Sequence, residues 1–293
     1  MILSFDIGGT FIKWGLVKDF QIIEKGKVPT PLDSFESFLE TIKPIVSKYQ
    51  PEALAFSLPG TMNPEKTQIF IGGAIRYNDF RFFPKEVSQY FGLPVTMEND
   101  ANAAALAEIE LGHLKNSTNG LVIVVGTGLG GVYIHNGEII RGSHGYGGEI
   151  SFLTSKNLYE NSFMTSIVGE QLGMRPFIAH CKEVLKIDDL TGESFMSLVD
   201  DGNENAISLL EEYMKIFAHL IYTLQIVYDP DTIVIGGGVS SNTTYMNYLK
   251  KHVSEVLGFI PLQVPFASIE ACTYYNDSNI MGAVVSYYRQ RKG

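Results

Sequence analysis

An apolar strand that leads through a glycine–threonine turn into a second β-prone segment occurs twice in this 293-residue chain. The first copy spans residues 2–17 and turns at Gly8-Gly9-Thr10, and the second spans residues 121–140 and turns at residues 126–131. A repeated supersecondary unit indicates two related halves. Because each turn leads into another strand and not into a helix, it fits neither the dinucleotide-binding nor the Walker pattern. Such a hairpin turn can still surround phosphates with backbone N–H groups.

A third glycine turn, Gly236-Gly237-Gly238, follows the apolar strand 232–235 and precedes a helical stretch from about Thr244 to Leu257. Without side chains, this turn leaves room for a flat group such as adenine or ribose. Each turn also has a plain structural explanation, as a hairpin connection or as a site of close helix–strand packing. That explanation is weakest for residues 126–131, where four glycines cost conformational entropy unless the backbone must bend or approach a ligand.

The segment Glu98-Asn99-Asp100 separates an apolar strand over residues 93–97 from an alanine-rich helix pattern that reaches Leu111. Asn99 or Asp100 is expected to cap this helix. The Asp100 carboxylate would then lie at the carboxyl edge of a sheet, where open α/β proteins bind ligands. An isolated Asp here would usually be only a cap. Beside phosphate-binding turns, however, Asp100 is a candidate general base for a hydroxyl that attacks the γ-phosphate of a nucleotide.

The overall composition is that of a folded α/β enzyme, with 45% hydrophobic and 18% charged residues and 29 glycines. A formal net charge of −10 argues against a nucleic-acid-binding surface. Neither cysteine, Cys181 or Cys272, belongs to a CxxC or zinc-type cluster, so both are expected to be reduced and packed. The start of the sequence resembles no signal peptide and no apolar run has membrane-spanning length, so the expected location is the cytoplasm, without membrane contact.

The chain is long enough for two domains or for one large one, and its hydrophobic periodicity predicts an α/β structure. Helices are expected at residues 33–50, with Asp33 and Glu36 as capping partners, and at residues 203–228 and 280–289. Residues 62–83 are expected to be an excursion with little regular structure, and residues 155–200 to hold short helices. The polar break at residues 115–120 is the candidate boundary. We therefore expect domains at residues 1–117, joined by a C-terminal helix at about 279–293, and at residues 118–278.

Four motifs together resemble those of the ROK family (repressor, open reading frame, kinase), in order and spacing, over essentially the whole chain. These motifs are Asp6-Ile7-Gly8-Gly9-Thr10, residues 98–104, residues 126–131 and Gly147-Gly148-Glu149. The resemblance implies the actin/hexokinase/Hsp70-like (ribonuclease H-like) fold, in which two α/β domains close on a nucleotide cleft. It also implies a homodimer that phosphorylates sugars with ATP and Mg2+.

Carried over residue by residue, the resemblance assigns the functional positions. Asp100 is implied as catalytic base, and Gly60, Asn99, Asp100, Glu149 and Glu160 as sugar-binding residues. The implied ATP site comprises Asp6, which also lies on the magnesium side, with Gly8, Gly9, Thr10, Lys13, Gly126, Thr127, Gly128, Gly130, Gly236, Gly237 and Gly238.

The chain departs from the family pattern at one point. Many members have a Glu-x-Gly-His motif followed by cysteines that hold structural zinc, whereas Phe152 stands here at the His position and residues 156–166 contain no cysteine. We therefore predict no structural zinc. The missing His normally contacts the sugar, so its loss leaves the identity of the substrate undetermined. The match of Glu160 to a family sugar-binding Glu is made without the cysteines that normally flank that position.

The sequence thus predicts a sugar kinase that transfers the γ-phosphate of ATP to a hydroxyl, expected at O6, of a hexose or hexose derivative. N-acetylmannosamine, a β-glucoside and glucose are the candidate substrates. The alternative is a non-catalytic sensor of sugar or nucleotide on the same fold. A DNA-binding repressor is disfavoured, because only five residues precede Asp6 and the chain is acidic.

Overall fold

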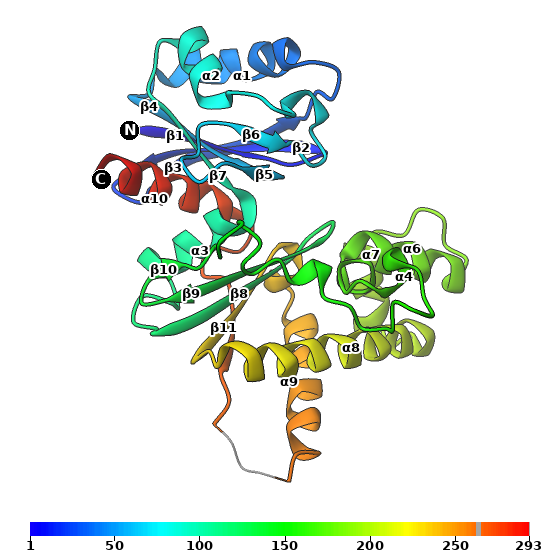
Figure 1. The fold of residues 1–293 in the computed structure, drawn as a ribbon. Helices are drawn as coiled ribbons and strands as arrows, with labels where there is room; N and C mark the ends of the chain where they lie inside the picture. The colour runs from blue at the N-terminus through cyan, green and yellow to red at the C-terminus, as the bar shows by residue number, and fades with distance from the viewer. Residues whose placement is uncertain (262–264, 293) are drawn as a thin grey trace. The chain divides into compact units, whose positions relative to one another are not determined.

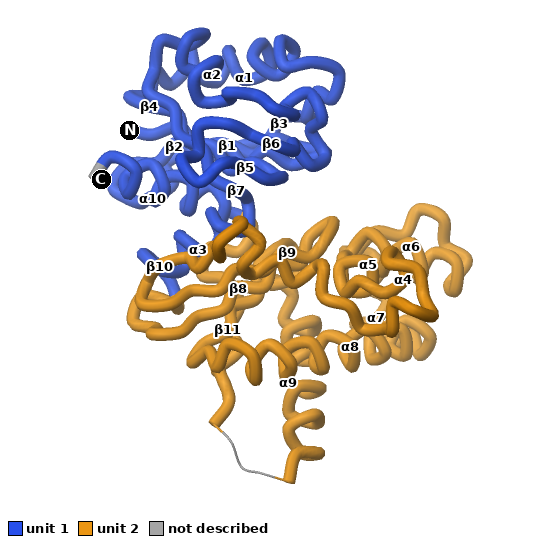
Figure 2. The backbone as a smooth tube through the Cα atoms, viewed as in Figure 1, with its two compact units in different colours: residues 1–112, 277–293 blue, residues 113–276 orange. Residues whose placement is uncertain are grey.

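A computed structural model describes residues 1–261 and 265–292 of the chain. The chain divides into two compact units, Met1–Gly112 with Asp277–Gly293 (unit 1) and His113–Asn276 (unit 2), drawn in separate colours in Figure 2. Each unit is described by itself. The expectation of domains at residues 1–117, joined by a C-terminal helix at about 279–293, and at residues 118–278 stays a prediction.

Unit 1 is built on a sheet of order β3-β2-β1-β4-β7. Its strands are β1 (Ile2–Ile7), β2 (Phe11–Lys18), β3 (Gln21–Pro29), β4 (Ala53–Leu58) and β7 (Val95–Asn99). The β1–β2 and β2–β3 pairs are antiparallel, whereas β1–β4 and β4–β7 are parallel. The carboxyl ends of β1, β4 and β7 therefore meet at one edge of the sheet.

Both faces of this sheet are covered by helices (Figure 1). Helices α1 (Phe35–Tyr49) and α2 (Phe83–Phe91) pack on one face, where Phe38 and Phe83 join Phe5 and Phe56 in a fully buried cluster. Helix α10 (Ser278–Lys292) packs on the other face, where Ser4 Oγ donates to the Ile280 carbonyl at 2.8 Å. Because side chains alternate along β1, Asp6 shares the face of Ser4 and lies on the α10 side.

Unit 2 repeats the arrangement of unit 1. Its sheet has the order β10-β9-β8-β11-β12, with antiparallel β8–β9 and β9–β10 pairs and parallel β8–β11 and β11–β12 pairs. The strands are β8 (Asn119–Val125), β9 (Leu129–His135), β10 (Glu138–Ile139), β11 (Thr232–Gly236) and β12 (Ser268–Ala271). The repetition seen in the sequence is therefore a repetition of sheet topology.

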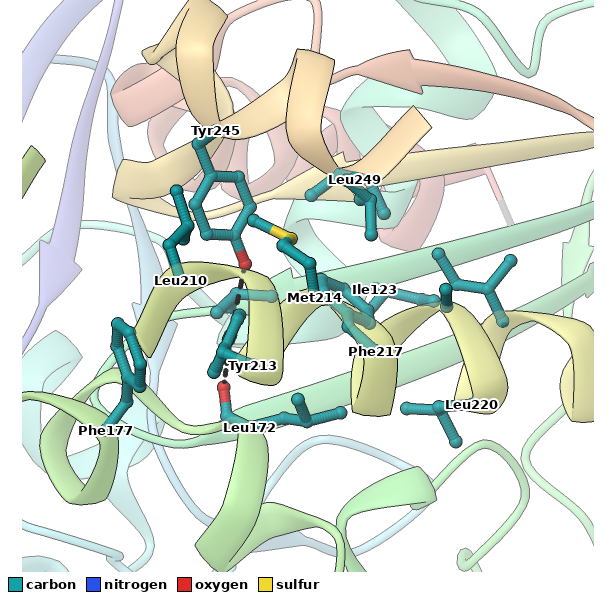
Figure 3. Packing of buried hydrophobic residues seen from close by; sticks show 14 of the residues in the cluster. Ile123, Leu172, Phe177, Leu210, Tyr213, Met214, Phe217, Leu220, Tyr245 and Leu249 are labelled. Atoms are coloured by element: carbon teal, nitrogen blue, oxygen red, sulfur yellow. Dashed lines mark hydrogen bonds between the residues drawn. The ribbon is translucent and has the colours of Figure 1, made fainter. Parts of the chain in front are cut away.

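Helices α8 (Glu204–Tyr228) and α9 (Thr243–Gly258) cover one face of this second sheet (Figure 1). Shorter helices complete the unit, namely α4 (Phe163–Ser166), α5 (Gly169–Leu172), α6 (Met174–Leu185) and α7 (Gly192–Asp200). In the core, the Tyr213 hydroxyl donates to the Leu172 carbonyl at 2.8 Å and lies 3.1 Å from the Tyr245 hydroxyl (Figure 3). Burial raises the pKa of both tyrosines, so both stay protonated donors.

Several expectations from the sequence are confirmed in the structure. The 203–228 and 280–289 helices appear as α8 and α10, both cysteines are buried and form no disulfide, and residues 155–200 hold short helices. None of the helices within residues 1–261 and 265–292 combines the length and the apolar character that a membrane crossing needs.

The structure of unit 1 differs from the expectations at two points. Most of residues 62–83 lie outside helices and strands, as predicted, but β5 (Thr61–Met62) and β6 (Ile69–Ile71) form a hairpin that the sequence did not indicate, and the one-turn helix η1 (Arg76–Asn78) follows. Their Asn, Gln and Gly content hid the pairing from a reading of periodicity. Helix α1 is capped by Ser34, whose side chain accepts from the Ser37 N–H at 3.1 Å, and not by Asp33 and Glu36.

Helix α10 packs closely on helix α3 (Asp100–Leu111), because both present small residues at the contact. A Cβ atom added to Gly282 would lie 1.6 Å from the Ala103 carbonyl oxygen, so only glycine fits there. This contact fixes the helix that begins with Asp100.

Gly282→Ala should therefore destabilise unit 1 by about 1–3 kcal/mol, since the added methyl group must push two helices apart. Urea unfolding measures the change. Gly258→Ala, at a helical glycine with no described atom within 4 Å of the added Cβ, serves as control and should be neutral or slightly stabilising. Equal stabilities of the two variants would contradict the close packing.

Candidate functional site

The Asp6 carboxylate lies near the carboxyl end of β1 and is only 8% exposed. Its Oδ1 atom accepts from Asn279 Nδ2 at 2.9 Å and from Ser57 Oγ at 3.2 Å. Lys13 Nζ lies 3.6 Å from the other oxygen, Oδ2, because the β1–β2 register places Lys13 opposite Asp6. The buried charge is thus held by groups from three further elements, β2, β4 and α10.

The first glycine turn connects β1 and β2, and its carbonyl groups are bound from one side. Thr30 Oγ1 donates to the Gly8 carbonyl at 2.7 Å, and the Thr30 N–H donates to the Thr10 carbonyl at 3.0 Å. In a trans peptide the C=O and the next N–H point in opposite directions. All peptide bonds of the described chain are trans, so the Gly9 N–H points away from Thr30. Gly9 and Thr10 are both exposed.

The second turn, between β8 and β9, has the same property in unit 2. The N–H groups of Met174 and Arg175, at the start of α6, donate to the carbonyls of Gly126 and Thr127 at 2.9 and 3.1 Å. The Thr127 and Gly128 N–H groups therefore point away from α6. A Cβ atom on Gly128 would meet no described atom within 4 Å, so open space adjoins the turn. Paired N–H groups that face open space are a suitable anion site.

Only glycine fits at position 237 of the third turn. This residue has φ +86°, and an added Cβ atom would lie 2.0 Å from the Val125 carbonyl oxygen. Its own carbonyl accepts from the Ser240 N–H at 3.1 Å and from Ser240 Oγ at 2.8 Å. Gly238 is exposed beside it, and Gly236 is the last, buried residue of β11. Gly130 lies outside the turns, in β9, where it pairs with Val124.

Asn99 and Asp100 form the junction between β7 and α3 in unit 1. Asn99 is the N-cap, since its Oδ1 accepts from the Asn102 N–H at 3.2 Å, and its Nδ2 donates to the Gly60 carbonyl at 2.9 Å. Asp100 is the first helical residue, is half-buried, and accepts at Oδ1 from the Ala101 N–H at 2.8 Å. Asn99 is therefore held at both ends of its amide, at the same sheet edge as Asp6.

A buried ion pair lies next to this junction and stabilises it. Glu98 is fully buried and forms a salt bridge with Lys66, from the β5–β6 connection, whose side chain is 18% exposed. The Glu98 carboxylate also accepts from the Asn99 N–H at 3.1 Å and from Ser286 Oγ of α10 at 3.2 Å. The pair thus ties the hairpin, β7 and α10 to the residue that precedes Asp100.

In unit 2, Glu149 lies in the glycine-dense segment that follows β10. Its side chain is exposed at the surface, yet partial desolvation by the surrounding protein raises the pKa of the carboxyl above its usual range. The Glu149 carbonyl accepts from the Phe152 N–H at 3.2 Å. Phe152, at the position of the family His, is 51% exposed. Glu160 is exposed in a turn closed by its own N–H and the Asn157 carbonyl at 3.2 Å.

Sequence reasoning missed four residues that organise these groups: Thr30, Ser57, Lys66 and Asn279. Each is a common polar residue with no local motif. Asn279, for example, is 273 positions from its partner Asp6. The fold alone brings them to their partners.

The environment of Asp6 fits a magnesium ion that is held mainly by phosphate oxygens and water. Mg2+ in nucleotide sites usually takes one or two carboxylates and keeps several waters. Asp6 supplies one carboxylate with Oδ1 already fixed by two donors, which leaves Oδ2, near Lys13, for an ion or its water. Within residues 1–261 and 265–292, no three His, Cys, Asp or Glu side chains gather as a metal-binding group.

A surface depression in unit 1, lined among others by Val46, Gln50, Tyr90 and Phe91, is not part of this site. Pro51 and Leu93, which also line it, precede β4 and β7. The depression therefore lies at the sheet edge opposite to Asp6 and Asp100.

The fold defines a class of α/β proteins with a duplicated sheet and with hairpin turns suited to anions, and the comparisons with known proteins give its family. The model of the ROK family matches residues 2–289. The Beta-glucoside kinase of Listeria monocytogenes is 30% identical over 99% of this chain and 98% of its own length.

Two solved structures are similar over nearly the whole chain. A ROK family protein from Streptococcus pneumoniae in complex with sucrose has 29% identity and a TM-score of 0.87, and covers 99% of both chains. A ROK family glucokinase from Streptomyces griseus, in complex with glucose and AMPPNP, has 22% identity and a TM-score of 0.87, which shows the same fold over 100% of this chain and 99% of its own. The chain belongs to the ROK family and is a carbohydrate kinase within it.

Lys66→Met should destabilise the protein by about 3–5 kcal/mol, because it leaves the Glu98 charge buried without its cation. Glu98→Gln should cost less, and the double variant less than the sum of both single variants. Urea unfolding of all four proteins measures the coupling. Strict additivity would show that the buried ion pair does not act as a unit.

The absence of structural zinc is tested by elemental analysis of the purified protein. Phe152 and the cysteine-free segment 156–166 leave no thiolate or imidazole set of the kind that holds structural zinc, so we expect far less than about one zinc per chain. Stoichiometric zinc that survives dialysis against a chelator would refute this prediction.

Proposed function

We propose that this carbohydrate kinase transfers the γ-phosphate of ATP to the O6 hydroxyl of a hexose that carries a substituent at C1, foremost a β-glucoside. The observation that carries the proposal is the pair of hairpin turns whose N–H groups point away from the groups that bind their carbonyls. Free N-acetylmannosamine and glucose are the remaining candidates. The choice among substrates is supported by the relatives, because one is named for β-glucosides and another binds sucrose, which is also a glycoside.

In the proposed reaction, the Asp100 carboxylate accepts the proton of the sugar O6 hydroxyl while O6 forms a bond to the γ-phosphorus. The bond between the γ-phosphorus and the bridging oxygen breaks, and ADP leaves with its electron pair. Asp100 suits this role because Asn99 and the Glu98 network fix the backbone before it. Such transfer depends mainly on position and on charge stabilisation.

The turns supply that charge stabilisation. The N–H groups of Gly9, Thr127 and Gly128 are aimed away from Thr30 and α6, so they can donate to phosphate oxygens. Thr10 adds a hydroxyl and Lys13 a positive charge. Gly236, Gly237 and Gly238 form the proposed surface for the adenosine. When bound at Asp6, magnesium would neutralise charge on the phosphates.

The sugar is proposed to bind through polar side chains that are already oriented. Asn99 is held by its bonds to Gly60 and Asn102, and so presents a fixed amide. Glu149 is proposed to accept from sugar hydroxyls, and Glu160 is the second candidate of this kind. The homodimer and the cytoplasmic location expected from the sequence stay predictions.

Asp100→Asn should lower kcat by about two orders of magnitude or more and leave the KM for the sugar nearly unchanged, because the amide cannot accept the proton. A coupled ADP-release assay measures both constants. Glu204→Gln is the matched control, since Glu204 also follows an Asn N-cap at the first position of its helix. It should keep full activity.

If Asp100 were only a helix residue, both variants would lower the melting temperature slightly and neither would lose turnover. If the chain were a sensor, the wild-type protein would bind ATP and sugar but release no ADP with any sugar of a panel. Either result would contradict the proposal.

A further inference from the structure

We propose that three exposed aromatic side chains of unit 2, Tyr146, Phe152 and Phe163 (the aromatic strip), form a subsite for the group attached to C1 of a glycoside substrate. This inference rests on the proposed function, because it assigns a position to the part of the substrate that does not react. The occupant is an aryl group or a second pyranose ring.

The three rings lie next to one another and remain open to solvent. Tyr146, Phe152 and Phe163 are 68%, 51% and 47% exposed. The centroids of Phe152 and Phe163 are 6.5 Å apart with 21° between the ring planes, and those of Tyr146 and Phe152 are also 6.5 Å apart. Contiguous exposed apolar patches mark binding surfaces more often than scattered exposed residues do.

The backbone connects this strip directly to the proposed sugar ligand Glu149. The Glu149 N–H donates to the Tyr146 carbonyl at 3.1 Å, and the Phe152 N–H donates to the Glu149 carbonyl at 3.2 Å. Two of the rings thus flank Glu149 at three residues on either side. A sugar bound by this carboxylate would have them as its neighbours.

The third ring is also held in place. The Ser155 N–H donates to the Ser166 carbonyl at 2.9 Å, and the Val168 N–H to the Leu153 carbonyl at 2.8 Å. These bonds fasten the short helix α4, which carries Phe163, beside the segment that follows Phe152. Aromatic rings presented by a fixed backbone lose little conformational entropy on binding.

The chemistry favours the C1 substituent over the reacting end of the sugar. In a β-glucoside, C1 and the carbon that bears C6 flank the ring oxygen, and their equatorial substituents diverge, so a group on C1 extends away from the reacting O6. The flat apolar faces of Phe and Tyr match an aryl ring or the C–H face of a second pyranose. The β-glucosides for which one relative is named carry a substituent at C1, and so does the glucose unit of the sucrose bound to another, where the substituent is a fructofuranose ring.

The experiment compares kcat/KM for phenyl β-glucoside and for glucose in the wild-type protein, Phe152→Ala and Phe163→Ala. Each variant should lower the ratio of the two constants about fivefold to tenfold, as expected for one aromatic contact that phenyl β-glucoside makes and glucose does not. Phe152→Tyr should restore the ratio. Phe259→Ala, which removes another exposed phenylalanine of unit 2, should not alter it.

An unchanged ratio would overturn the subsite. So would a change in molar mass by light scattering in Phe152→Ala, with both substrates affected equally, because the strip would then be an interface between copies. If the wild-type protein turned over no sugar, the proposed function would fail by itself. In that case, calorimetry without ATP would test the subsite separately. The subsite predicts that Phe152→Ala weakens the binding of phenyl β-glucoside even in a protein that turns over no sugar.

Discussion

The C=O and the following N–H of a trans peptide point in opposite directions, so a glycine turn whose carbonyl groups are bound on one side presents N–H groups to an anion on the other. Both hairpin turns of this chain meet that condition with different means. Thr30 binds the carbonyls of Gly8 and Thr10, whereas the start of α6 binds those of Gly126 and Thr127. The repeated sheet topology places both turns at the carboxyl ends of β1 and β8. The orientation of these N–H groups, more than the presence of glycine, suits the turns to phosphate oxygens.

The buried carboxylates of unit 1 are likewise stabilised by side chains from neighbouring elements. Asp6 is buried, but two neutral donors and Lys13 stabilise its charge. Glu98 is buried more deeply and is stabilised by Lys66 and Ser286. Asp100 follows Glu98 by two residues, on a helix whose packing against Gly282 of α10 permits no side chain. The proposed base therefore stands on a rigid support, which is what a position-dependent transfer reaction requires.

The sequence was informative where local chemistry decides the structure. Apolar strands before glycine turns, a helix cap at Asn99 or Asp100 and the long helix at residues 203–228 are all encoded by neighbours in sequence, and all were predicted; the structure selects Asn99 as the cap. The β5–β6 hairpin was not, because its short strands lack a clear alternation. Asn279, Lys66 and Thr30 were also missed, since distant chain segments define their roles. The contact between Phe152 and Phe163 likewise depends on how α4 folds back, so the sequence showed only a missing His and not the aromatic strip.

The central claim is that this chain forms a phosphate ester on the sugar and does not merely sense it. The most direct measurement is phosphorus–proton correlation NMR of the product formed from ATP and phenyl β-glucoside by the wild-type protein. The account predicts a single new phosphate ester coupled to the C6 protons of the intact glycoside, with ADP in equal amount. Binding of both ligands without any ester, or an ester at another carbon, would contradict it.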